Sequence, residues 1–217
     1  MVKTLVSPDY AEMGAMAAQA CGNARPDGAS VLMIDDLSSP FVAQMKRDGF
    51  MARAEELGNV SLAAAVLADG TEGSVQQATE KAIAENESVN AVFSTEELFY
   101  PGALAAVRAS GRDISIISVG GGEGVLGEVA GGGLYASVFS SPAELARIAG
   151  EDAVILARDS NAGVLSFEWL KLELITRDNA VQYAAKGGYA DLLTPVALSP
   201  SPSEQAAPEQ GTASAET

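Results

Sequence analysis

The sequence of 217 residues contains no histidine and a single cysteine, Cys21. Without histidine, catalysis by Ser-His or Cys-His pairs is excluded, as are most zinc sites. One cysteine forms no disulfide within the chain, and with no histidine to activate its thiol we expect Cys21 to be buried or inert. We expect a protein that is not an enzyme and that uses no metal and no cofactor.

Basic residues are also scarce, because 13 lysines and arginines stand against 29 acidic residues and give a net charge of -16. They are dispersed rather than clustered, so we expect no nucleic-acid partner. No segment approaches the 18 or so apolar residues of a membrane span, and the first residues lack the apolar stretch and cleavage site of a secretory signal. As written, the sequence predicts a soluble protein without an export signal, hence a cytoplasmic one.

Short apolar runs alternate with amphipathic segments along the chain. We predict strands at 4–7, 30–34, 60–67, 91–93, 114–119, 135–139 and 167–175, and helices at 11–20, 40–57, 72–85, 101–109, 124–130 and 143–158. This alternation is typical of an α/β fold, a three-layer αβα sandwich with a mainly parallel sheet.

The segment 90–121 contains a central strand, helix and strand. Pro101 lies in the first turn of its helix, and Gly111 follows the last turn. Two parallel strands joined by a helix cross over in the right-handed sense, and ligands of such sheets bind beyond the carboxyl ends of the strands. Those ends are Ser94–Glu97 and Gly120–Gly122, where we predict the functional site.

A resemblance to a known family rests on five segments: SVLMIDDLSSPFVAQMKRDGF, SVNAVFSTEELFYPGALAAVRASG, ISIISVGG, GLYASVFSSP and LELITRDNA. In this order and spacing they resemble the sugar-binding class of type I periplasmic binding proteins, the D-ribose-binding group in particular. The resemblance covers residues 5–179 and only about the second half of such a protein. It implies one lobe of a two-lobed clamp, without the amino-terminal lobe, and a periplasmic or cell-envelope location.

The resemblance also implies a division of the chain and a set of partners. Residues 1–141 would form the carboxyl-terminal lobe, and residues 142–192 a returning helix, strand and end segment. The helix 143–158 would normally pack on the absent lobe, so we expect an exposed apolar stripe and self-association. Implied partners are a sugar-like solute and an ABC transporter permease. By composition, residues 193–217 are predicted to be a disordered tail.

The family's ligand-binding positions fall on four residues of this sequence, Gln44, Glu96, Gly120 and Ser140. Gln44 stands where an arginine often grips sugar hydroxyls, and Glu96 where an Asn-Asp pair usually begins. Gly120 replaces a hydroxyl-binding aspartate, and Ser140 replaces a glutamine or asparagine. Gly70 stands where an aromatic ring commonly stacks on the sugar. Two or three strong contacts to a simple pentose or hexose are therefore missing.

Two alternatives remain open. The effector-sensing domain of a LacI-type repressor shares the same clamp, and an upstream helix-turn-helix would identify it. The run Gly122–Gly127 fits the G-x-G-x-x-G pattern of a nucleotide-dependent enzyme, although a tight turn also needs small residues. The paired acids Asp35–Asp36 and Glu96–Glu97 can in principle bind a divalent cation or act in a glycosidase. Neither role is favoured, because adjacent acids point different ways and solvated acids near helix N-termini, stabilised by the helix dipole, explain them better.

Overall fold

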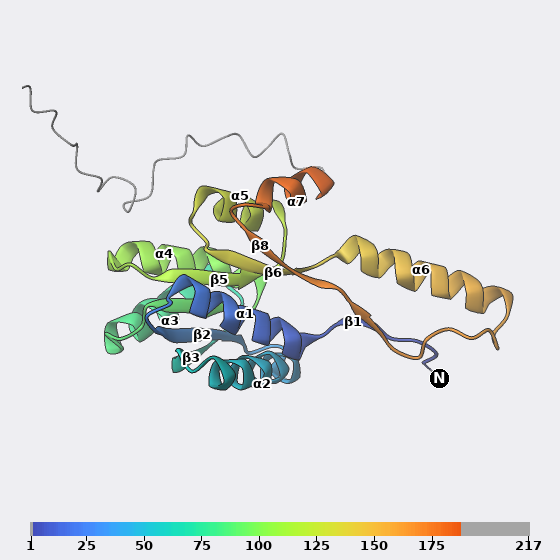
Figure 1. Cartoon of the computed structure of the whole chain (residues 1–217), viewed down its shortest axis with the longest axis horizontal. Helices are drawn as coiled ribbons and strands as arrows, with labels where there is room; N and C mark the ends of the chain where they lie inside the picture. The colour runs from blue at the N-terminus through green and yellow to red at the C-terminus, as the bar shows by residue number, and fades with distance from the viewer. Residues whose placement is uncertain (1, 188–217) are drawn as a thin grey trace, which may run out of the picture.

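The computed structural model describes residues 2–187 (Figure 1). Within that range, six strands form one sheet in the order β3-β2-β4-β5-β6-β8, of which all but β8 are parallel. In chain order the elements are β1 (Val6–Pro8), α1 (Tyr10–Ala24), β2 (Ala29–Asp36), α2 (Pro40–Leu57), β3 (Val60–Ala68), α3 (Glu72–Glu85), β4 (Ala91–Ser94), η1 (Glu97–Phe99), α4 (Tyr100–Ser110), β5 (Ser115–Val119), α5 (Glu123–Gly131), β6 (Ala136–Ser140), α6 (Pro142–Arg158), β7 (Glu168–Leu170), β8 (Leu172–Thr176) and α7 (Ala180–Gly187).

Helices cover both faces of this sheet, because the side chains of a strand alternate between its faces. In β2, Val31 and Met33 pack on α1 and α2, whereas Leu32 and Ile34 belong to the core formed with α3, α4, α5 and α7. The central strands are buried on both sides, as their continuous apolar runs predict. The predicted three-layer αβα sandwich with a mainly parallel sheet is confirmed.

Helices α1 and α2 cross with their backbones in contact. A Cβ added at Gly49 would lie 2.5 Å from the carbonyl carbon of Ala11, and one added at Gly14 would lie 2.8 Å from that of Lys46. Asp9 caps α1, since its carboxylate accepts a hydrogen bond of 3.0 Å from the amide of Glu12. Lys46 of α2 reaches the carboxyl end of β4, where its ammonium donates to the carbonyl of Thr95.

Cys21 lies inside the layer formed by α1. Its side chain is completely buried, and this burial raises the pKa of the thiol far above its usual value. A thiol with a raised pKa carries little of the thiolate that reacts with electrophiles or metals. The prediction of a buried cysteine is thus confirmed.

One segment departs from the sequence prediction. Residues 167–175, expected to form a single strand, divide at Lys171 into β7 and β8, which belong to different sheets. β7 pairs in parallel with β1, whereas β8 runs antiparallel to β6. A period-two apolar pattern runs through both strands, so it gave no sign of the break. We call the large sheet and the helices that cover its two faces the lobe. The pair β1-β7 connects the lobe to α6, which projects away from the sheet (Figure 1).

We call the projecting part the apolar arm, defined by α6, β1, β7 and the segment 159–167. The structure describes all of α6, and of its residues only Ile148 is buried. The large apolar side chains exposed on the arm are Leu145, Val154, Ile155, Leu165, Phe167 and Trp169. The predicted apolar exposure of this helix is confirmed. The division at residue 141 stays a prediction, and the predicted tail 193–217 lies outside the described residues.

Candidate functional site

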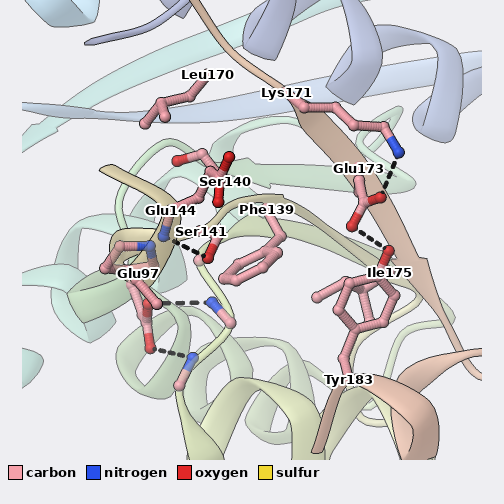
Figure 2. A pocket seen from close by; sticks show the side chains of 15 residues that line it. Glu97, Phe139, Ser140, Ser141, Glu144, Leu170, Lys171, Glu173, Ile175 and Tyr183 are labelled. Atoms are coloured by element: carbon pink, nitrogen blue, oxygen red, sulfur yellow. Dashed lines mark hydrogen bonds and ion pairs between the residues drawn. The ribbon is translucent and has the colours of Figure 1, made fainter. Parts of the chain in front are cut away.

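A cavity of about 760 Å³ opens beyond the carboxyl ends of β5 and β6, where the lobe meets the apolar arm (Figure 2). Parallel strands bring their carboxyl ends to one edge, so the turns after β5 and β6 become neighbours. Its wall is formed by Glu97, Gly120, Gly121, Gly122, Phe139, Ser140, Ser141, Pro142, Ala143, Glu144, Leu170, Lys171, Glu173, Ile175 and Tyr183. The site therefore lies at the edge that the sequence predicted.

Glu97 reaches this wall from the turn after β4. The hydroxyl of Ser94 donates to the carbonyl of Glu96 at 3.0 Å, and the short helix η1 begins at the next residue. The Glu97 carboxylate accepts hydrogen bonds from the amides of Gly121 at 3.3 Å and Gly122 at 3.0 Å, drawn as dashed lines in Figure 2. These amides precede α5, whose positive end favours an anion.

In the turn at 120–122, side chains larger than that of glycine would collide with neighbouring atoms. Gly120 has a φ of +97°, which side chains rarely tolerate, and a Cβ there would lie 2.6 Å from Cδ of Glu97. A Cβ at Gly121 would lie 2.6 Å from Cε2 of Phe139. The aspartate that the resemblance places at position 120 thus has no room, because the Glu97 carboxylate already lies there.

The same arrangement bears on the nucleotide alternative. In the dinucleotide-binding turn, backbone amides at the helix N-terminus hold a pyrophosphate. Here the amides of Gly121 and Gly122 are occupied by the Glu97 carboxylate, which would also repel a phosphate. The run Gly122–Gly127 therefore acts in this structure as a tight turn that binds an internal anion.

Glu96 points away from the cavity, toward α2. It forms an ion pair with Lys46, whose ammonium also donates to the carbonyl of Thr95 at 2.7 Å and lies 5.6 Å from the ring centre of Tyr10. Only 3% of the Lys46 side chain is exposed, so these partners must stabilise the buried ammonium in place of water. The predicted site residue Glu96 is thus held by an ion pair within the protein and does not line the cavity.

Gln44 lines a second, smaller hollow of about 250 Å³. Its amide donates to Asp48 at 2.6 Å, one turn along α2. The same hollow is lined by Asp35, which is buried against Arg47, and by Asp36, which accepts from Ser38. Gly120 and Ser140 line the large cavity and Gln44 the small one, so the structure does not bring all four predicted residues together. Their role as ligand contacts stays a prediction.

Several wall residues were missed by the sequence reasoning. The rings of Phe139 and Tyr183 meet edge to face, 5.8 Å apart, and the Tyr183 hydroxyl donates to Glu173. Desolvation together with the Glu173 carboxylate raises the pKa of Tyr183 to about 12. Lys171 donates to the same carboxylate at 2.6 Å. The spacing of Ala180, Tyr183 and Ala184 is the signal that could have predicted α7, which carries the tyrosine.

The paired acids diverge: Asp35 and Asp36 lie in β2 and alternate between its faces, whereas Glu96 and Glu97 lie where the chain turns into η1. Asp35 pairs with Arg47 and Asp36 with Ser38, whereas Glu96 turns to Lys46 and Glu97 to the glycine turn. Among residues 2–187, no group of three or more His, Cys, Asp or Glu side chains is placed to hold a metal ion. In the same described part, no helix is both long and apolar enough to cross a membrane.

Comparisons with known proteins show the family and the fold of this chain. A family model described as a periplasmic binding protein domain matches residues 2–161. The ribose import binding protein of Bacillus subtilis is 27% identical over 152 residues, which are 70% of this chain and 49% of that protein. The chain therefore spans about half the length of this curated relative.

Solved structures share the fold. A periplasmic solute-binding protein of an ABC transporter from Actinobacillus succinogenes, solved with D-allose, superposes with a TM-score of 0.76 at 16% identity, over 83% of this chain and 64% of that one. A carbohydrate transporter solute-binding protein from Agrobacterium radiobacter, in complex with D-arabinose, gives 0.74 at 16% identity, over 88% and 66%. Since the family model covers well over half of its residues, the chain belongs to the periplasmic binding protein domain family.

Proposed function

We propose that this chain is one lobe of a solute receptor that binds carbohydrate-like ligands without transforming them. The observation that carries the proposal is the cavity at the carboxyl ends of β5 and β6, lined on one side by the lobe and on the other by the first residues of α6 and by Leu170 of β7. A ligand held there touches both the lobe and the connecting strands. The relatives solved with D-allose and D-arabinose share this fold.

The proposed mechanism is closure of a hinge. A ligand that contacts two lobes binds the closed form more tightly than the open form, and this difference in affinity drives the motion. One lobe supplies only part of these contacts. We therefore expect the isolated chain to bind sugars with a dissociation constant in the millimolar range or weaker, about 4 kcal/mol or less.

NMR titration of the 15N-labelled chain with D-ribose, D-allose and D-arabinose tests this function. At concentrations up to about 50 mM, appropriate to millimolar binding, the amides of Gly121 and Gly122 should shift. The amides of Gly58 and Gly111 are the control, because they precede β3 and β5 and lie at the opposite edge of the sheet. Shifts at the control residues alone, or none at the turn with any sugar, would refute the proposal.

The apolar arm is proposed to pack on a first lobe in a complete receptor, and in the isolated chain on a second copy. Val154 and Ile155 are 52% and 44% exposed, so burying the remaining surface is favourable by about 1 kcal/mol each, roughly half the value for a fully exposed side chain. Sedimentation velocity should show association that the double change Val154→Ser and Ile155→Ser abolishes. The exposed Ala153→Ser variant serves as control. A monomer at every concentration would contradict the self-association.

An ABC transporter permease as recipient of the solute, and a periplasmic or cell-envelope location, are parts of the same proposal. They are supported by the relatives, which belong to import systems. The effector-binding domain of a LacI-type regulator has the same clamp. The DNA upstream of Met1 separates the two, since a first lobe with a signal peptide indicates transport and a helix-turn-helix indicates regulation.

A further inference from the structure

We propose that Glu97 makes this face select ligands that carry hydroxyl or ammonium donors and reject anionic ligands. The inference rests on the proposed function, because it names the ligand class of the same cavity. Glu97 takes the place at the glycine turn that an external anion would otherwise occupy, so the turn is closed to anions by the chain itself.

The carboxylate is held in a fixed position. Each of its two oxygens accepts one backbone amide, from Gly121 or Gly122, and a carboxylate has about four acceptor positions in all. Acceptor positions therefore remain on a group that lines the cavity. Because the two amides fix its orientation, Glu97 needs no reorganisation when a donor arrives from the ligand.

The charge around the cavity is one-sided. Three carboxylates line the wall, Glu97, Glu144 and Glu173, against one ammonium, Lys171. Lys171 donates to Glu173, and Glu144 pairs with Arg147 on α6. Within the described residues no cationic side chain pairs with Glu97. Its negative charge is thus compensated only by backbone dipoles, and a ligand with a carboxylate or phosphate nearby meets repulsion.

A ligand that carries hydrogen-bond donors is attracted by the Glu97 carboxylate. A sugar hydroxyl can donate to the remaining lone pairs of Glu97 while its apolar ring face lies over Phe139, and an ammonium adds charge to the same contact. Glu97 thereby supplies, from the end of β4, an acceptor beside the turn where Gly120 has no side chain. It is a specificity-determining residue that the predicted set of Gln44, Glu96, Gly120 and Ser140 did not include.

The first test uses three ligands with one pyranose skeleton: glucosamine, glucose and glucuronate. They are titrated into the 15N-labelled full chain at about pH 6, where the amine is protonated and the carboxylate ionised. We expect glucosamine to bind at least about threefold tighter than glucose, and glucuronate at least about tenfold weaker. In Glu97→Gln the three affinities should converge. In the control Glu128→Gln, whose carboxylate pairs with Arg108 and lies outside the cavity wall, the order should persist.

The outcomes separate this inference from the proposed function. Equal binding of all three ligands, or an order that survives in Glu97→Gln, overturns the charge selection and leaves carbohydrate binding intact. Failure of glucose and the other neutral sugars to shift the turn overturns the proposed function instead. The role of Glu97 as internal anion is then judged by the second test, which needs no sugar.

The second test removes the internal anion. Glu97→Ala frees the amides of Gly121 and Gly122 at the start of α5, so inorganic phosphate should bind there and stabilise the variant. We expect about 20 mM phosphate to raise the Tm of Glu97→Ala by about 2 °C more than that of the unchanged chain, compared with chloride at equal ionic strength. Equal shifts in the two proteins, including no shift in either, would overturn the inference.

Discussion

Replacing Gly120 with alanine tests how tightly the glycine turn is packed against Glu97. At a φ of +97° an alanine costs about 1–2 kcal/mol for the backbone alone. The new Cβ would also lie 2.6 Å from Cδ of Glu97, so the carboxylate must leave the amides of Gly121 and Gly122. Losing two hydrogen bonds to a charged acceptor adds about 2 kcal/mol. We expect the free energy of unfolding to fall by about 3–4 kcal/mol.

A double-mutant cycle separates these two costs. The Cβ of Glu97 itself lies 2.9 Å from the position of the added Cβ, so Glu97→Gly is the background that removes the whole contact. In that background only the backbone cost should remain, about 1–2 kcal/mol. The double variant should therefore be about 2 kcal/mol more stable than the sum of the single changes predicts.

Equilibrium unfolding in urea, followed by far-UV circular dichroism, is the appropriate assay. The single tryptophan, Trp169, is half exposed on the apolar arm, so its fluorescence would report on the arm rather than on the lobe. The slope of the transition should be unchanged among the four proteins. If Gly120→Ala costs the same in both backgrounds, within about 0.5 kcal/mol, then Glu97 does not occupy the space beside the turn.

Three further predictions concern the lobe. Gly49→Ala should lower the free energy of unfolding by about 3 kcal/mol in urea, because its Cβ would press on the backbone of Ala11. Its control is Gly73→Ala, which has open space around it and should be neutral or slightly stabilising. Cys21 should react with a thiol reagent only after unfolding, and rapid labelling of the native chain would contradict its burial. Arg112→Met should cost about 2–4 kcal/mol in the same urea assay, since four carbonyl groups in the last turn of α3 and the segment that follows it lose their donor. An unchanged midpoint would show that water replaces the guanidinium.

The sequence by itself determined the fold of this protein. Apolar runs of strand length, amphipathic helices and glycines at their ends are local signals, and every parallel strand of the large sheet was predicted from them. The edge of the sheet that carries the cavity followed as well, because carboxyl ends of parallel strands meet at one edge. The exposed side of α6 was expected on another ground, because the family resemblance implies that this helix packs on the other lobe of a two-lobed clamp.

Only the tertiary structure decided which groups form the site. Lys46 and Glu96 lie 50 residues apart in the sequence, and Glu97 and Gly122 lie 25 apart, so neither pairing leaves a periodic trace along the chain. The break at Lys171 was hidden as well, because a period-two pattern continues unchanged when a strand passes from one sheet to another. Secondary structure follows from neighbours in sequence, whereas ion pairs and the glycine turn depend on where distant segments meet in space.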